Sequence, residues 1–279
     1  MAAAQPTARV RDVVAVVEAA YPPGLAADWD AIGLTCGDPD AEVRRILLAV
    51  DPVAVVVDEA IGMRADLLLT HHPLFLSGVH SVAAVDSKGS VAHRLISHGI
   101  ALLTAHTNAD HAQGGVSDAL AAALGVRDLR PLAPLEGAPQ LGTGRIGTLD
   151  GAVTLEQFAE HVASVLPPTK HGVRVAGDPQ ATVRTVAMCG GSGDSLLADA
   201  AGIADVYVTS DLRHHRVLDH LADGGCPVID VAHWASEWPW LALAAEAIAD
   251  GLAQRGITVE IEISEIPTDP WTAHRGSQP

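Results

Sequence analysis

Imidazole and carboxylate side chains recur just after short apolar runs in this sequence, where ligands gather if the runs are strands of an open α/β sheet. A mixture of histidine and acidic residues suits zinc, manganese, iron or cobalt better than calcium or magnesium, which prefer oxygen ligands. The sequence therefore predicts a centre of two divalent metal ions per subunit, with zinc, manganese and iron as candidates. The predicted ligands are His71, His72, Asp110, His233 and Glu237.

Two adjacent histidines argue for two ions rather than one. In a straight strand His71 and His72 would point to opposite faces, so one ion could hardly take both imidazoles. Pro73 biases His72 toward an extended backbone, and each imidazole can then address its own ion. A pair of loop histidines without a ligand is the alternative for an isolated His-His sequence. The imidazole and acidic residues after the other apolar runs favour the metal centre.

Two carboxylates complete the predicted centre. Asp110 and Glu237 can bridge two cations held roughly 3.5 to 4 Å apart and reduce the repulsion between them. His233 and Glu237 are four residues apart, so they share one face if this segment is helical. Taken alone, a solvated helix face would explain that spacing equally well.

The segments that would position these residues alternate between two types. Short, almost wholly apolar runs indicate strands buried on both faces, and the stretches between them are compatible with helices. The sequence therefore predicts an α/β fold with largely parallel sheets covered on both sides. The expected strands are Ile46–Val50, Leu67–Thr70, Ile100–Thr104, Val186–Cys189, Val206–Thr209 and Val228–Asp230, and the expected helices include Val53–Gly62, Val91–His98, Leu155–Leu166 and Arg213–Ala222.

Both ends of the chain carry a recognisable period. Helical spacing after Thr7 is shown by Val10, Val13, Val14 and Val17, which predicts an amphipathic helix capped by that threonine. The late segment Thr258–Ile266 instead alternates between apolar and acidic residues, and this pattern predicts a half-exposed edge strand.

The segment from Pro131 to Gly144 contains three prolines and three glycines and has neither a helical nor a strand period. We therefore place a connecting segment at residues 131–144, between a first α/β lobe (1–130) and a second α/β lobe (145–279). The metal site is expected in the cleft between these lobes, because the predicted ligands come from both.

A weak internal repeat makes the two lobes pseudo-equivalent. Arg45–Asp51 resembles Arg184–Gly190, and Ala65–His71 resembles Ala204–Ser210, both at an offset of 139 residues. Ala-His-x-x-x-acid also occurs twice, at His106 and His233, with an offset of 127. An ancient duplication is the simplest account of two matches that share one offset, although apolar strands also resemble one another by chance.

Composition limits the possible partners. The formal net charge of −17 disfavours direct DNA binding and anionic membranes. Three cysteines without a CxxC spacing suit a reducing compartment, and neither a signal peptide nor a membrane span is recognisable, so we expect a cytoplasmic protein. Gly190–Gly193 lacks the full spacing of a phosphate-binding loop and is interpreted as a tight turn.

At the residues named above the sequence resembles the Nif-three-like dinuclear metal-centre family, some members of which carry the name type 2 homologue of GTP cyclohydrolase I. The resemblance runs from about Val13 to Ile257. Ala31 and Ser210 depart from the family pattern, which often has Asn and usually Gly at these positions, and neither is a ligand position. The matching motifs are Trp29–Leu34, Leu69–Leu74, Thr104–Asp110, Gly144–Gly147, Gly190–Gly193, Thr209–His215 and Ala232–Glu237.

The resemblance places His106, Asp211 and His215 close to the centre, and it assigns the metal-ligand roles to His71, His72, Asp110, His233 and Glu237. His106 and His215 are then the candidates for proton transfer in catalysis. The predicted function is a metal-dependent hydrolase acting on a small-molecule substrate, such as a nucleotide in a GTP cyclohydrolase-like reaction, or a phosphoester. The alternative is a non-catalytic metal-binding or regulatory oligomer, since a cluster alone does not establish turnover. The resemblance also implies a homohexamer.

Overall fold

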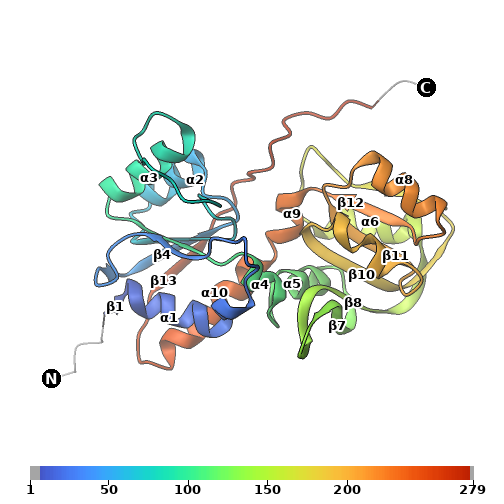
Figure 1. Cartoon of the computed structure of the whole chain (residues 1–279), viewed down its shortest axis with the longest axis horizontal. Coiled ribbons are helices and arrows are strands. Elements are labelled where there is room, and N and C mark those ends of the chain that lie inside the picture. Colours follow the sequence, from blue (N-terminus) through green and yellow to red (C-terminus); the bar gives the residue numbers. More distant parts are fainter. Residues whose placement is uncertain (1–6, 277–279) are drawn as a thin grey trace. The chain divides into compact units, whose positions relative to one another are not determined.

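The computed structural model describes residues 7–276, which divide into two compact units (Figure 1). The first unit runs to Ala112 and also contains Leu241–Thr268, and the second contains Gln113–Trp240 and the chain from Asp269. Both units combine a β-sheet with helices, as the predicted α/β class requires. Within residues 7–276, no helix is both long and apolar enough to cross a membrane.

The main sheet of the first unit has the strand order β13-β4-β5-β6-β2. Neighbours from β13 to β6 are parallel, and β2 is antiparallel to β6. A separate antiparallel pair joins β1 and β3. The elements of this unit are β1 (Ala8–Arg9), α1 (Val10–Ala20), η1 (Pro23–Leu25), β2 (Gly33–Cys36), β3 (Glu42–Val43), β4 (Arg45–Ala49), α2 (Ala54–Gly62), β5 (Leu67–Thr70), α3 (Ser87–Ser97), β6 (Ala101–Thr104), α4 (Thr107–His111), α10 (Trp240–Ala253) and β13 (Glu260–Ile263).

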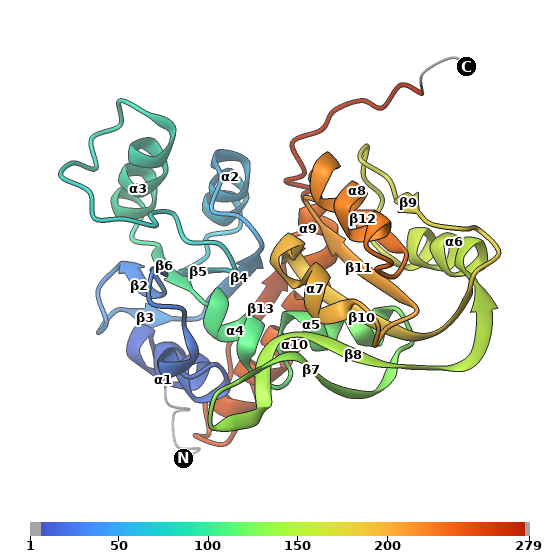
Figure 2. The ribbon, with the colours of Figure 1, turned by 45° about the vertical axis from the view of Figure 1, so that its right-hand side comes forward.

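Helices cover both faces of this sheet. Val57 of α2 and Leu95 of α3 pack in one core with Leu47, Leu68 and Leu102 from the central strands. Figure 2 shows α2 and α3 on one side of the sheet and α1 on the other. The predicted strands are therefore buried on both faces, as their continuous apolar runs indicated.

The two periodic segments of this unit confirm the predicted elements, with one difference in capping. Helix α1 begins after Arg9, whose backbone N–H donates to the Asp12 carboxylate at 2.8 Å, so the cap lies beyond Thr7. Strand β13 is an edge strand that pairs with β4. It exposes Glu260 and Glu262, while Ile261 and Ile263, which alternate with them, are half-buried.

The second unit has the strand order β7-β8-β10-β11-β12-β9. Only β10, β11 and β12 are parallel, whereas β7, β8 and β9 pair antiparallel, so the sheet is parallel at its centre and mixed overall. The elements are α5 (Val116–Ala123), β7 (Arg127–Leu135), β8 (Ala138–Thr154), α6 (Leu155–Val165), β9 (Arg174–Ala176), β10 (Thr182–Ser192), η2 (Asp194–Leu196), α7 (Leu197–Ala200), β11 (Val206–Ser210), α8 (His214–Ala222), β12 (Val228–Val231) and α9 (His233–Glu237).

Successive residues of β10 belong to different cores. Met188 packs with Phe158 of α6 in one core, and Ala187 packs with Leu197 of α7 in the other. Side chains that alternate between the two faces of a strand explain this division.

The segment 131–144, expected to connect two lobes, instead belongs to the β7 and β8 hairpin. Its glycines serve the hairpin: Gly137 has φ +75° at the turn, and a Cβ on Gly142 would lie 2.2 Å from the Ala133 carbonyl oxygen. The compact units therefore divide at Ala112 rather than near 130, and the late segment Leu241–Thr268 returns to the first unit. Sequence could not show this return, because the pairing of β13 with β4 joins residues far apart in the chain.

The internal repeat corresponds to the same contact in each unit, a brace in which one aspartate carboxylate accepts two consecutive backbone N–H groups. In the first, the Asp66 carboxylate accepts the backbone N–H groups of Arg44 and Arg45 at 2.7 and 2.9 Å. In the second, the Asp205 carboxylate accepts those of Arg184 and Thr185 at 3.0 and 2.7 Å. The braced strands thus correspond at an offset of 140 rather than the 139 inferred from sequence, while the aspartates keep 139.

Candidate metal centre

Three histidines of the first unit lie at the carboxyl ends of neighbouring strands. His71 and His72 directly follow β5, and His106 lies between β6 and α4. Because β5 and β6 are parallel neighbours, their carboxyl ends lie at the same edge of the sheet. Asp110 lies on the short helix α4 that follows His106.

An oxygen acceptor holds the Nδ1 atom of each of these imidazoles. His71 Nδ1 lies 3.0 Å from the Ala105 carbonyl oxygen, and His72 Nδ1 lies 2.7 Å from Asp51 Oδ1. His106 Nδ1 lies 2.8 Å from Asp30 Oδ1. Carbonyl and carboxylate oxygens only accept, so Nδ1 carries the proton and Nε2 carries the lone pair. That tautomer, held by an oxygen, is the usual arrangement of a metal-binding histidine.

The three imidazoles also converge. Ring centroids are 5.0 Å apart for His71 and His72, 5.1 Å for His71 and His106, and 5.5 Å for His72 and His106. One ring nitrogen from each lies within 4.8 Å of the others, so the group can hold one metal ion. The expectation that one ion could hardly take both His71 and His72 is therefore wrong, because both residues lie beyond the end of β5 rather than within a straight strand. Asp110 Oδ1 is 3.7 Å from His71 Nε2. The structure thus brings His106, a predicted proton-transfer residue, into the same group as two predicted ligands.

The buried carboxylate of Asp30 fixes the orientation of His106. The Asp30 side chain is 0% exposed, and it accepts hydrogen bonds from His106 Nδ1 and from the backbone N–H and hydroxyl of Thr107. Burial raises the pKa of Asp30, but the hydrogen bonds from His106 and Thr107 outweigh it and leave the pKa below its usual value. Burial and the neighbouring His71 lower the pKa of His106. A neutral His106 with a lone pair on Nε2 follows.

Asp51 connects His72 to the late part of the chain. One carboxylate oxygen accepts from His72 Nδ1, and the other accepts from the Thr268 hydroxyl. The segment that ends at Thr268 is anchored by Ser264, whose backbone N–H donates to the Leu48 carbonyl and whose hydroxyl donates to Glu59. The orientation of His72 therefore depends on a residue nearly two hundred positions later in the sequence.

In the second unit, His233 and Glu237 are the first and last residues of α9. The predicted helix is present, and His233 Nε2 lies 2.9 Å from Glu237 Oε1. Glu237 is 3% exposed, and a buried carboxylate requires a cationic or hydrogen-bonding partner. The separation allows both atoms to reach one cation at typical bond lengths of about 2.0 to 2.2 Å.

Asp211 supports His233 as the first unit's aspartates support their histidines. Asp211 Oδ2 lies 2.7 Å from His233 Nδ1, and this hydrogen bond is the main reason why the pKa of Asp211 lies below its usual value. Asp211 has φ +59°, a left-handed conformation that aspartate tolerates better than most residues. Its carboxylate is thus placed directly after β11 to fix the tautomer of His233.

Gly191 makes room for this pair. A Cβ on Gly191 would lie 2.3 Å from Glu237 Oε1 and 3.2 Å from His233 Nε2, and its φ is +69°. The backbone N–H of Gly191 donates to the Ser236 hydroxyl at 2.8 Å. The sequence indicated only a tight turn at Gly190–Gly193. The structure shows in addition that the backbone of this segment comes close to the candidate ligands.

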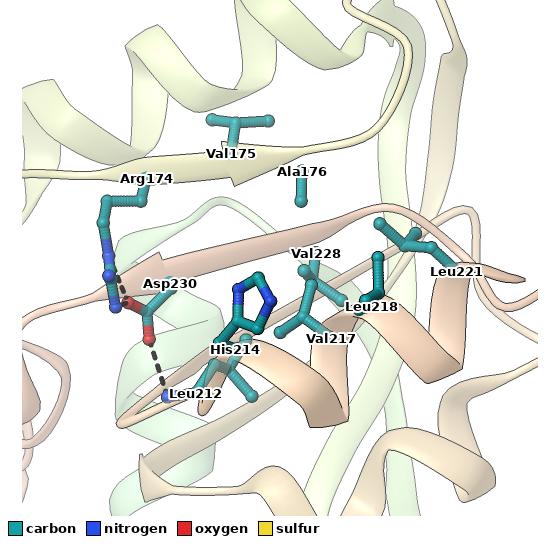
Figure 3. A pocket seen from close by; sticks show the side chains of 10 residues that line it. All are labelled: Arg174, Val175, Ala176, Leu212, His214, Val217, Leu218, Leu221, Val228 and Asp230. Carbon is teal, nitrogen blue, oxygen red and sulfur yellow. Dashed lines mark hydrogen bonds and ion pairs between the residues drawn. The ribbon is translucent and has the colours of Figure 1, made fainter.

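His215, the other predicted proton-transfer residue, is exposed on α8, outside the contacts of His233 with Asp211 and Glu237. The second unit also contains a cavity of about 380 Å³ beside β9, β12 and α8. Figure 3 shows Arg174 paired with Asp230 at one end of it and apolar side chains such as Leu218 around the rest. His233 and Glu237 do not line this cavity.

Asp51 and Gly191 were not predicted from the sequence as site residues. Asp51 had a usable signal, because it is the polar residue that ends the apolar run containing β4. Gly191 had none, since the need for a missing Cβ appears only once Glu237 is placed. The donor set of both units fits divalent transition metals: imidazole nitrogens with fixed tautomers together with carboxylate oxygens.

The fold and these groups define a two-unit α/β protein with residues suited to metal binding. The chain belongs to the Duf34/NIF3 (NGG1p interacting factor 3) family, whose model matches residues 8–270. This match confirms the resemblance drawn from the motifs.

Similar proteins agree with this assignment. A protein named GTP cyclohydrolase 1 type 2 homolog from Streptomyces coelicolor is 49% identical over 275 residues, covering 97% of this chain and 96% of that protein. One of the same name from Mycobacterium tuberculosis is 36% identical, covering 94% and 96%. Among solved structures, a Bacillus cereus protein related to NIF3 has a TM-score of 0.89 at 26% identity, covering 95% of this chain and 99% of that one. A Staphylococcus aureus hypothetical protein has a TM-score of 0.88 at 28% identity, covering 96% and 100%.

Proposed function

We propose that this protein is a dinuclear metal-dependent hydrolase that acts on a nucleotide or another phosphoester. Its two divalent metal ions are held by His71, His72, Asp110, His233 and Glu237. One observation carries the proposal: every imidazole in the set has its Nδ1 atom fixed by an oxygen acceptor, which presents Nε2 as a ligand. The names of the relatives support a nucleotide as one substrate candidate.

The residues divide the chemical work. Bound divalent ions supply Lewis acidity and lower the pKa of water. His71 and His72 bind through nitrogens whose tautomers Ala105 and Asp51 fix. His106, held by Asp30 and kept neutral by its lowered pKa, accepts the proton of the attacking water and returns it to the leaving group.

Metal analysis and turnover test the proposal together. Purified protein is loaded with manganese, iron or zinc, and GTP, a phosphodiester and a phosphomonoester are assayed. We expect two equivalents of metal per chain and metal-dependent turnover of at least one substrate class, which His72→Ala abolishes. His98→Ala is the matched control, because His98 is an exposed histidine of the same unit whose Nδ1 bonds to the Arg94 carbonyl. Turnover that persists in His72→Ala contradicts the proposal.

A non-catalytic metal-binding or regulatory oligomer is the competing function. It rests on the same donor groups and predicts full metal loading without turnover of any of these substrates. We further propose a homohexamer, which light scattering of the purified protein tests by its molar mass relative to the 28.8 kDa chain.

A further inference from the structure

A cavity of about 260 Å³ lies in the first unit beside His72 and Asp51. Most of its lining is apolar. Pro52, Leu74 and Val91 are its buried lining residues, and Leu74 and Val91 are only 3% and 4% exposed. Val53 is an exposed lining residue, at 39%. A candidate metal ligand thus borders a space that suits an apolar group rather than bulk water.

One basic side chain, that of a lysine, is among the residues that line this cavity. Lys88, exposed at the start of α3, is part of the lining. The chain contains only one other lysine, Lys170, and its formal net charge is −17. Asp51, the acid of the same lining, is engaged by His72 and Thr268 through hydrogen bonds to its two oxygens. Lys88 therefore supplies local attraction for an anion on a chain whose overall charge repels anions.

We propose that this cavity is the subsite for the organic group of a small anionic substrate. One aromatic ring or a short aliphatic chain lies against Leu74 and Val91, and Lys88 attracts the phosphoryl group toward His72. This inference rests on the proposed function and narrows its substrate class to phosphoesters with a compact, apolar organic group.

The size of the cavity is the reason for restricting the substrate class to phosphoesters with a compact organic group. Sites for drug-sized ligands have volumes of about 300 to 1,000 Å³. A cavity of about 260 Å³ lies below that range, so it encloses one ring rather than a whole nucleotide. The lining offers few hydrogen-bonding groups beyond Ser87 and Lys88, whereas a nucleobase would need several.

Binding of two phosphonates, which resist hydrolysis, tests the subsite directly. Calorimetry on the metal-loaded full chain compares phenylphosphonate with methylphosphonate. We expect phenylphosphonate to bind at least about tenfold more tightly, since apolar pockets gain about tenfold or more for each buried methylene. Ala54→Leu, at an exposed lining position on α2, fills the cavity and should remove most of this preference. Lys88→Gln should weaken both phosphonates and leave their ratio unchanged.

Matched substitutions serve as controls. Lys170→Gln removes the other lysine, and Ala198→Leu enlarges an exposed alanine of α7, so both should behave as the unmodified protein. An equal affinity for the two phosphonates, or a preference that survives Ala54→Leu, overturns the subsite. Metal-dependent turnover with either of those results leaves the hydrolase intact and removes only the subsite. A preference lost in Ala54→Leu without any turnover keeps the subsite and removes the hydrolase.

Discussion

The two units share a scaffold and differ at the ends of their strands. Gly37–Ile46 and Gly177–Val186 read GDPDAEVRRI and GDPQATVRTV, and each segment enters the strand that an aspartate braces. Where the first unit has His71 and His72 after β5, the second has Ser210 and Asp211 at the corresponding positions of the β11 segment. The first unit presents three imidazoles, and the second presents one imidazole with a buried glutamate.

This difference shows how two copies of one fold can carry different side chains at corresponding positions. Asp51 follows β4 and holds His72, whereas the corresponding position after an offset of 140 is Gly191, whose missing side chain leaves space for Glu237. In the second unit the supporting acid is Asp211, and it occupies the position that corresponds to His72, a proposed ligand of the first unit. Both units retain the hydrogen bonds from strand backbone to Asp66 or Asp205, whereas the residues beyond the strand ends have different roles in the two units.

Removal of one ligand from each unit should have the largest effect. His72→Ala and Glu237→Gln are each expected to lower the metal content of the purified protein by at least one ion per chain. The reason is that His72→Ala removes a donor atom and Glu237→Gln removes the negative charge of a ligand, and either change should cost more than the 10- to 100-fold in affinity typical of supporting residues. Elemental analysis measures the stoichiometry. If Glu237→Gln keeps full metal content, the second unit does not contribute as we propose.

Removal of the supporting aspartates should have the next largest effect, and a similar one in both units. Asp51→Ala and Asp211→Ala should weaken metal binding about 10- to 100-fold, because each imidazole loses the acceptor that fixes its tautomer. Chelator competition measures the affinity. Asp51→Asn and Asp211→Asn, which keep an acceptor oxygen, should recover part of it. Alanine variants that bind metal normally would show that these aspartates serve the fold alone.

Gly191→Ala tests whether the second unit depends on the missing Cβ. The new methyl group would meet Glu237 Oε1, so metal affinity should fall in addition to a stability cost of roughly 1 to 2 kcal/mol for the left-handed backbone. Gly202→Ala is the control, because Gly202 has φ +73° and open space where its new methyl group would lie. Thermal unfolding should shift similarly in both variants. Equal metal affinity in the two would remove the role assigned to Gly191.

Thr268→Val should have the smallest effect, confined to the first unit's histidines. The valine keeps the shape of threonine but cannot donate to Asp51, so His72 is held less firmly and metal affinity should fall about two- to tenfold. Thr268→Ser should retain the affinity, and Thr258→Val, at an exposed position of the same late segment, should match the unmodified protein. An affinity unchanged in Thr268→Val would separate the late segment from the site.

Sequence predicted the elements better than their connections. The apolar runs located β4, β5, β6, β11 and β12 to within about a residue, because a strand buried on both faces leaves a continuous signal. The antiparallel β7, β8 and β9 were missed, since β7 and β8 contain prolines and glycines and β9 has only three residues. The return of β13 to the first unit depends on pairing that no local pattern encodes.

The candidate site likewise contains residues that sequence could predict and residues that it could not. Histidines and acids after apolar runs could be found from residue type and position, and the structure brings His71, His72 and His106 together. The supports were harder to find. Asp30 and Thr268 act through contacts over 76 and 217 residues, so their roles appear only when the chain is folded.

Anomalous diffraction from crystals of the metal-loaded protein tests the central claim most directly. The account predicts two metal peaks per chain, about 3.5 to 4 Å apart, with His71, His72, Asp110, His233 and Glu237 as the protein ligands. A single peak, or two peaks bound by other residues, would contradict it.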